Sequence, residues 1–215
     1  MSTRPQPESG IGAQSPTCEA LLIALGELVH QHGARNVSLR SVARHTGVSH
    51  SAPGHCFGDM EGMLAEFARR GFQELQARLE GASATTDTAG DQLNAFVEAY
   101  IGFAKSHPSQ FDIMFRAGLD KSRHPALSTA AERTRETLGA PALALSSSPG
   151  STADPATIAL GFWALAHGLA SLAIDGQLEA LFDSPDISKL TTSVLNTTTT
   201  ATQTSPSRDY PGSSD

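Results

Sequence analysis

The sequence predicts an all-α protein of about nine helices, in which a three-helix, helix-turn-helix head joins a larger helical domain. Three observations predict this fold class. Ala and Leu, which favour helices, dominate the patterned segments. Apolar residues recur at helical spacing, and β-branched residues form no alternating runs. The 215 residues allow one or two domains of the usual ~100–200 residues each.

The N-terminal part begins with a polar segment and a first helix. Residues 1–16 are rich in Pro, Ser, Gly and Gln, so we expect a disordered leader. The first helix is predicted over 17–32, where Leu21 and Leu25 belong to an apolar face that faces the core. Gly33 follows and ends the helix, as a residue that tolerates positive φ commonly does.

Residues 37–59 predict two short helices joined by a tight turn. Ser38 is suited to cap the first of them, and Val42 and Ala43 lie on its buried face. Gly47 follows where a helix ending in a left-handed residue would place a glycine. The segment therefore has the order of elements found in a helix-turn-helix unit.

The second helix of this unit is expected to be capped by Ser49, with Pro53 in its first turn, where the missing N–H costs least. A helix-turn-helix needs a small residue four before its turn glycine so that the helices cross closely, and Ala43 stands there. A plain helical hairpin would match the same pattern. The polar side chains expected on this second helix are those of His50, Ser51 and His55.

Charge is distributed unevenly along the chain. The net charge is −7, yet no Asp or Glu occurs between Leu28 and Gly58, a window that holds three Arg and five His. A locally basic end on an acidic protein can still bind phosphate groups. No apolar run approaches the ~18 residues of a membrane span, and the polar N-terminus lacks a secretory signal. We therefore expect a cytoplasmic protein.

No sequence motif indicates catalysis or a cofactor. There is no Gly-rich phosphate loop, no His-x-x-x-His pair and no nucleophile elbow. Asp175 and Glu179 are four apart, which is more typical of a solvated helix face than of an acid/base pair. Cys18 and Cys56 make no disulfide framework and have no metal-ligand spacing, so we expect reduced thiols, no metal and no enzyme. A metal sensor using these cysteines and the head's histidines is an alternative that no spacing supports.

The rest of the chain predicts further helices. Asp59 is suited to cap a long helix, and Gly71 inside that helix predicts a close contact or a slight bend. The segment 155–181 is the most apolar and should be buried from more than one direction. Residues 201–215 are expected to form a disordered tail. The predicted helices of this part span 60–80, 92–106, 108–115, 125–138, 155–181 and 187–195.

In this order the elements resemble the TetR family of bacterial transcriptional regulators. Over 20–72 the chain is similar to the family's DNA-binding head and the start of its fourth helix. The residues that carry this similarity are Gly33, Ser38-Leu39, Val42-Ala43, Gly47-Val48-Ser49, Phe57 and Glu61-Gly62-Met63-Leu64. Later, HPSQFDIMF and WALAHGLASLAIDGQL resemble segments of one large subgroup, whose regulatory domain has a Trp, His-Gly signature (WHG-type).

The resemblance implies a DNA-binding domain over 17–59 and a helical ligand-binding and dimerisation domain over 60–200. It implies a homodimer formed through the last two helices, and a double-stranded, palindromic DNA operator as partner. A small apolar effector would release the DNA, so the expected function is that of a ligand-responsive repressor. The alternative is a helical small-molecule-binding dimer with weak or lost operator binding.

The resemblance also selects candidate site residues. Each has a plainer interpretation, as solvated helix surface in the head or as ordinary core in the body. The candidates for DNA contact are Ser38, Arg40, Arg44, Ser49, His50, Ser51 and His55. The candidates for the ligand pocket are Phe96, Tyr100, Phe103, Phe111, Met114, Phe115, Trp163 and His167.

Three residues depart from the family's pattern. Gly54 stands where the family usually has a Tyr, Cys56 where it has a His or similar polar residue, and Met60 where it has a Lys. The family's Tyr and Lys contact backbone phosphates. We therefore predict weaker DNA binding than is typical, with a shallower dependence on salt, since the slope follows the number of phosphates neutralised.

Overall fold

The structure is a computed structural model that describes residues 15–148, 153–181, 189–190 and 193. Within these residues the chain forms ten α-helices, two short 3-10 helices and no β-strand, which confirms the predicted all-α class. The helices are α1 (Pro16–His32), η1 (Ala34–Asn36), α2 (Leu39–Thr46), α3 (Ala52–Phe57), α4 (Met60–Ser83), α5 (Ala89–Ser106), α6 (Pro108–Arg116), η2 (Lys121–Arg123), α7 (Pro125–Glu136), α8 (Gly139–Ser146), α9 (Pro155–Ile174) and α10 (Gln177–Leu181).

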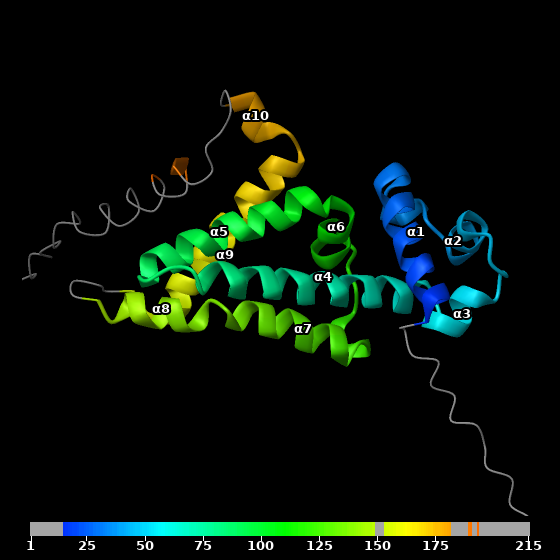
Figure 1. Cartoon of the computed structure of the whole chain (residues 1–215), viewed down its shortest axis with the longest axis horizontal. Helices are drawn as coiled ribbons and strands as arrows, with labels where there is room; N and C mark the ends of the chain where they lie inside the picture. Colours follow the sequence, from blue (N-terminus) through cyan, green and yellow to red (C-terminus); the bar gives the residue numbers. More distant parts are fainter. Residues whose placement is uncertain (1–14, 149–152, 182–188, 191–192, 194–215) are drawn as a thin grey trace, which may run out of the picture.

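Helix α4 joins the two parts of the molecule. Figure 1 shows the head, made of α1, α2 and α3, at the N-terminal end of α4, which then runs through the body between α5 and α7. Helix α6 packs against both α1 and α4, and α9 packs against α5 and α8. One continuous apolar core extends from Leu21 in α1 through Phe72 in α4 to Tyr100 in α5 and Ala166 in α9.

The starts of α2 and α4 and the end of α2 follow the predicted capping residues. Ser38 and Asp59 are the N-caps of α2 and α4, and the Asp59 carboxylate accepts a hydrogen bond from the Gly62 N–H at 2.8 Å. Gly47 ends α2 in the left-handed conformation, with φ at 70°. Helix α1 begins at Pro16 with Ser15 as its N-cap, so the predicted leader reaches two residues too far, and 1–14 lie outside the described residues.

The body differs from the prediction at two places. The predicted helix 155–181 is broken after Ile174, because Gly176 adopts a left-handed φ of 68° that ends α9 before α10 begins. Helix α8 was not predicted, because its apolar residues occur on all sides and no polar face marks it as a helix. The predicted last helix, 187–195, lies outside the described residues except at 189, 190 and 193, and the predicted tail lies wholly outside them.

Two glycines let other segments approach α4. A Cβ added at Gly71 would lie 2.4 Å from Met114 Sδ, which confirms the close contact predicted there. A Cβ added at Gly62 would lie 2.2 Å from the backbone oxygen of Phe57, the last residue of α3. Met114 has a flexible side chain, whereas the Phe57 oxygen belongs to the backbone. Gly62 is therefore the stricter requirement, and it sets how closely the head approaches α4.

Helix α9 has one buried and one exposed face. By length and composition α9 could cross a membrane, contrary to the expectation that no apolar run approaches such a span. In its apolar stretch of 18 residues, 22% of the residues are buried. Phe162, Ala166 and Ala170 face the core, whereas Leu160 and Leu172 are 59% and 39% exposed. The expected burial from several directions is therefore not found within the described part of the chain.

Replacing Gly62 by Ala tests the contact between head and body. We expect Gly62→Ala to lower the free energy of unfolding by about 1–3 kcal/mol, because the added methyl group overlaps a backbone oxygen that cannot rotate away. The matched control is Gly81→Ala in the same helix, where nothing lies within 4 Å of the added Cβ. The control should gain up to about 1 kcal/mol from helix propensity. Equal effects of the two substitutions in urea unfolding would contradict the close approach.

Candidate DNA-binding head and ligand cavity

The head presents its helix-turn-helix unit to solvent. Helices α2 and α3 are joined by residues 47–51, and no acidic residue occurs from 28 to 58. All seven side chains predicted to contact DNA are exposed. They are Ser38, Arg40 and Arg44 at α2, Ser49, His50 and Ser51 in the turn, and His55 on α3.

Helix α3 begins later than the sequence predicted. Its N-cap is Ser51, so Ser49 and His50 lie in the preceding turn rather than at the start of the helix. The backbone oxygen of Ser49 accepts from the Ala52 N–H at 3.0 Å. A helix capped by Ser49 would place Pro53 where an N–H must bond back to the cap residue, and proline has no N–H. Pro53 thus falls in the first turn, as predicted, but the turn is moved toward the C-terminus.

Ser38 has a structural role at the start of α2. Its Oγ accepts from the Ser41 N–H at 3.1 Å, and the Ser41 Oγ accepts from the Ser38 N–H at 2.9 Å. This reciprocal capping box satisfies two N–H groups that the first helical turn leaves without partners. The Ser38 side chain therefore already has a hydrogen-bonding role before any phosphate contact is considered.

The two departures from the family's phosphate anchors lie on consecutive helices, α3 and α4. Gly54 is exposed on α3, and a Cβ added there meets nothing within 4 Å. Met60, the first residue of α4, is half-buried and packs against the apolar core. A larger or charged side chain would therefore fit at Gly54, so steric hindrance does not explain the glycine at this position.

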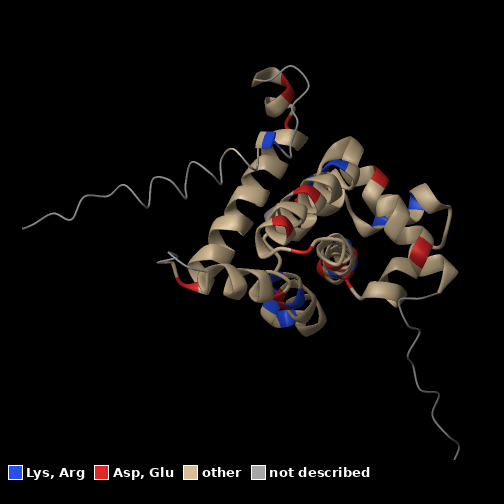
Figure 2. Ribbon diagram, turned by 60° about the vertical axis from the view of Figure 1, so that its left-hand side comes forward, with Lys and Arg blue, Asp and Glu red and all other residues tan. Residues whose placement is uncertain are grey.

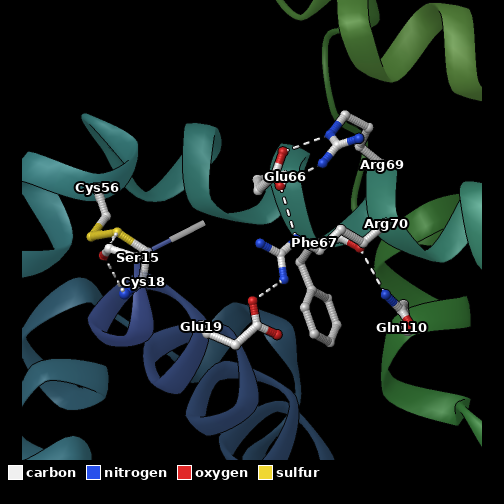
Figure 3. Close-up of polar contacts among 9 residues, drawn as sticks. All are labelled: Ser15, Cys18, Glu19, Cys56, Glu66, Phe67, Arg69, Arg70 and Gln110. Atoms are coloured by element: carbon white, nitrogen blue, oxygen red, sulfur yellow. Dashed lines mark hydrogen bonds and ion pairs between the residues drawn. A yellow bond between two sulfur atoms is a disulfide. The ribbon is translucent and has the colours of Figure 1, made fainter. Parts of the chain in front are cut away.

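Cys18 and Cys56 form a disulfide between α1 and α3, which corrects the expectation of two reduced thiols (Figure 3). Their Cα atoms are 5.7 Å apart, although 38 residues separate them in the sequence. Cys18 is fully buried, whereas Cys56 is partly exposed and lines an open hollow with Asp59, Glu66 and His124. The bond therefore holds α3 to the first helix of the head and lies beside solvent.

Ion pairs connect the head to α4. Figure 3 shows Arg70 of α4 between Glu19 of α1 and Glu66 of its own helix, and the Arg70–Glu66 distance is 2.9 Å. Arg69 donates two further hydrogen bonds to Glu66, each at 2.7 Å. Burial raises the pKa of Glu66, but hydrogen bonds from Arg69 and Arg70 outweigh this effect and hold the pKa below its usual range. The carboxylate therefore stays ionised and available to both arginines.

A second connection reaches the first turn of α4 from the body. Glu61 pairs with Arg123 of η2, and its Oε1 lies 3.4 Å from His124 Nε2. Helix α4 is also joined to α6, because Gln110 Nε2 donates to the Phe67 backbone oxygen at 2.9 Å (Figure 3). The N-terminal half of α4 is thus held by the head and by two segments of the body.

The body encloses an aromatic cavity of about 190 Å³ between α4, α5, α6, α7 and α9. Five of the eight predicted pocket residues line it: Phe96, Tyr100, Met114, Phe115 and Trp163. The other lining residues are Phe72, Gly118, Leu119, Lys121, Ala131, Thr134, Arg135 and Leu138. The cavity is therefore mainly apolar, with two cationic side chains in its wall.

The other three predicted pocket residues lie elsewhere. Phe103 is fully buried and stacks on His107, with ring centroids 5.1 Å apart. Phe111 lines a separate hollow beside Val29. His167 packs against the Phe111 and Phe115 rings at 5.2 and 4.9 Å. These three residues therefore pack near the cavity but do not line it.

Tyr100 and His167 form a polar contact at the edge of the cavity. The Tyr100 hydroxyl lies 3.1 Å from His167 Nδ1, and the tautomer of the histidine decides which group donates. Burial raises the pKa of Tyr100, so its hydroxyl stays neutral. The wall therefore offers a neutral hydroxyl in addition to its cations, and this pair fixes the orientation of both rings.

Lys121 and Arg135 are functional candidates that the sequence did not reveal. Lys121 lies between the predicted helices 108–115 and 125–138, and Arg135 lies within the second of them. The only sequence feature that could have indicated them is that both cations lie on segments next to a cluster of aromatic residues. Their convergence on one cavity follows from the packing of η2 and α7 against α4, which periodicity does not report.

The sequence profile of the family described as "Tetracyclin repressor-like, C-terminal domain" matches residues 93–196. Among proteins with curated functions, none matches the sequence.

Solved structures share the fold over most of the chain. A protein of unknown function from Rhodococcus sp. RHA1 is 26% identical, with a TM-score of 0.69 over 90% of this chain and 96% of its own. A tetR-family regulatory protein from Rhodococcus RHA1 is 16% identical, with a TM-score of 0.63 over 74% and 85% of the two chains. The transcriptional regulator FadR from Bacillus subtilis, solved in complex with stearoyl-CoA, is 14% identical, with a TM-score of 0.66 over 83% and 95%.

Reducing the disulfide should loosen the head. Closing a loop between residues 38 apart contributes up to about 4 kcal/mol of stability in the chain-entropy account. We therefore expect a dithiol reductant to lower the melting temperature of the wild-type protein, and the Cys56→Ser variant to melt at the lower temperature with or without reductant. A wild-type melting curve that reductant leaves unchanged, after thiol titration confirms reduction, would contradict this role.

Restoring a cation at position 60 should steepen the salt dependence of DNA binding. Met60→Lys keeps an apolar stem against the core and adds one charge to each subunit. For a dimer, the slope of log K against log salt should become steeper by roughly 2, since each neutralised phosphate contributes about 0.9. Thr129→Lys, at an exposed position of α7, is the control and should leave the slope unchanged. The measurement is a salt titration of DNA binding by fluorescence anisotropy.

Proposed function

We propose that the chain is a transcriptional regulator of the TetR family, a homodimeric repressor that binds a palindromic operator and is released by a small effector. The observation that carries this proposal is the pairing of an exposed, acid-free helix-turn-helix unit with an aromatic cavity on the same long helix, α4. A protein that only bound a small molecule would need the cavity but not the helix-turn-helix unit.

The head supplies the chemistry of DNA recognition. Arg40 and Arg44 are four apart on α2 and exposed, and neither is drawn into an ion pair within the described residues. Phosphate contacts from such cations position a protein on DNA, and side chains of the second helix contact the bases. We assign the first role to the arginines and the second to Ser51, the N-cap of α3, and His55, which lies within α3.

The exposed face of α9 supplies a surface for a second copy of the chain. Leu160, Ala164, Gly168 and Leu172 are exposed and four apart, so they form one stripe along the helix. Helix α9 contains no Lys, Arg, Asp or Glu, whereas charged residues are drawn on several other helices in Figure 2. Small residues in such a stripe let another helix approach closely. A dimer has a functional purpose, because one head alone contacts too few base pairs for useful specificity.

The cavity and the head are connected through η2. Lys121 lines the cavity, and two residues later Arg123 pairs with Glu61 in the first turn of α4. The Phe57 oxygen of α3 lies against Gly62 in the same turn. An effector that moves Lys121 would therefore displace a segment bonded to the base of the head. Such a regulator acts on DNA inside the cell, which agrees with the expected cytoplasmic location.

A mobility-shift assay with the DNA upstream of the protein's own gene tests the proposal. We expect specific binding at low salt, and a roughly ten-fold loss of affinity in Arg44→Ala, because a charge-assisted phosphate contact is removed. Arg133→Ala, at an exposed position of α7 outside the head, is the matched control and should bind as the wild type does.

The outcome of this assay also separates the two candidate functions. A folded, dimeric protein that shows no specific binding at low salt would overturn the repressor proposal. It would favour the alternative of a ligand-binding dimer that has lost operator binding, which the residues Gly54 and Met60 make worth testing.

A further inference from the structure

We propose that the effector is an apolar carboxylic acid, whose carboxylate binds between Lys121 and Arg135 while its hydrocarbon part fills the aromatic cavity. The inference rests on the proposed function, because it names the chemical class of the effector for that same cavity. Its basis is the pair of cationic side chains, Lys121 and Arg135, in the cavity wall.

The Lys121 side chain is directed toward the cavity. Its Nζ lies 5.4 Å from the centroid of the Phe72 ring, which forms part of the same wall. Arg135 reaches this wall from α7 and is exposed, so it lies where the cavity meets solvent. Neither side chain has an acidic partner among the described residues, whereas Arg69, Arg70, Arg78 and Arg123 are all paired with glutamates.

The electrostatics of this end of the cavity favour an anion. Burial, and then the positive charge of Arg135, lower the pKa of Lys121. Two like charges that flank a partly buried, apolar space raise each other's energy, because little water screens them. A carboxylate between them would relieve both effects through charge-assisted hydrogen bonds.

The remaining wall determines what the anion is attached to. Phe96, Phe115 and Trp163 make it aromatic, and the Thr134 hydroxyl already donates to the backbone within the core. The volume of about 190 Å³ is of the order of an apolar cavity of about 150 Å³ that holds one benzene ring. The cavity therefore suits one ring or a short alkyl chain, with its polar end at the two cations.

The ligand classes differ in what they offer Lys121 and Arg135. A neutral alcohol of the same length fills the apolar space but leaves both cations without a counter-charge. An amine adds a third positive charge. Octanoate, octanol and octylamine share a chain length and differ in the charge of the head group, so they isolate the contribution of the anion.

Trp163 allows binding to be measured directly. It is the single tryptophan of the chain and lines the cavity, so its fluorescence reports on occupancy without a label. For the wild-type protein at pH 7.5 we expect octanoate to bind roughly ten-fold or more tightly than octanol, and octylamine to bind most weakly.

The variants assign the preference to the two cations. In Lys121→Met, octanoate should lose most of its advantage over octanol, while octanol affinity stays unchanged, which also shows that the cavity remains folded. Arg135→Met should lose part of the same preference. Arg133→Met, on the same helix but outside the cavity wall, is the control and should retain it.

Two results would overturn the inference, and they differ in their meaning. Equal binding of octanoate and octanol, unaffected by Lys121→Met, would remove the anion preference and leave an apolar effector site in place. No binding of any of the three compounds, by fluorescence or by thermal shift, would also remove the small-effector part of the proposed function.

Discussion

The close contact between the end of α3 and the first turn of α4 is the constraint on which the rest of the structure depends. The Phe57 oxygen lies where any side chain at Gly62 would stand, so the head can approach α4 only over a glycine. The Asp59 cap fixes that turn from its N-terminal side, and Glu61 connects it to η2. Because α4 then continues through the body, the geometry of this one turn sets the orientation of the head relative to the cavity.

The distribution of paired and unpaired charges follows from this arrangement. Glu19 of α1 and the glutamates of the N-terminal half of α4 are used at the junction, where Glu19 and Glu66 share Arg70 and Glu61 pairs with Arg123. Arg40 and Arg44 on the outer side of the head have no such partner within the described residues. A protein with an acidic net charge can in this way keep a basic surface, because its acids are placed at internal contacts and on the body.

The sequence predicts those features of the structure that depend on neighbouring residues. The all-α class, the caps Ser38 and Asp59, the stop at Gly47 and the tight position of Gly71 follow from spacing and local conformation. The disulfide, the cations of the cavity and the separation of Phe103 and Phe111 from its wall do not. Each of these depends on which helices meet, and periodicity tells only that a residue faces inward, not which neighbour it faces. Helix α8 was not predicted for a related reason, because a helix without a polar face shows no periodic alternation of apolar and polar residues.

The same 3-10 turn serves the cavity and the junction. Lys121 contributes to the wall and Arg123 to the contact with Glu61, with one residue between them. In a turn of three residues the backbone offers few ways to move one side chain without moving the other. In the proposed function, a charge bound beside Lys121 would act on the base of α4 through this short covalent path rather than through the whole packed core. The position of Lys121, more than the size of the cavity, would then determine how ligand binding affects the head.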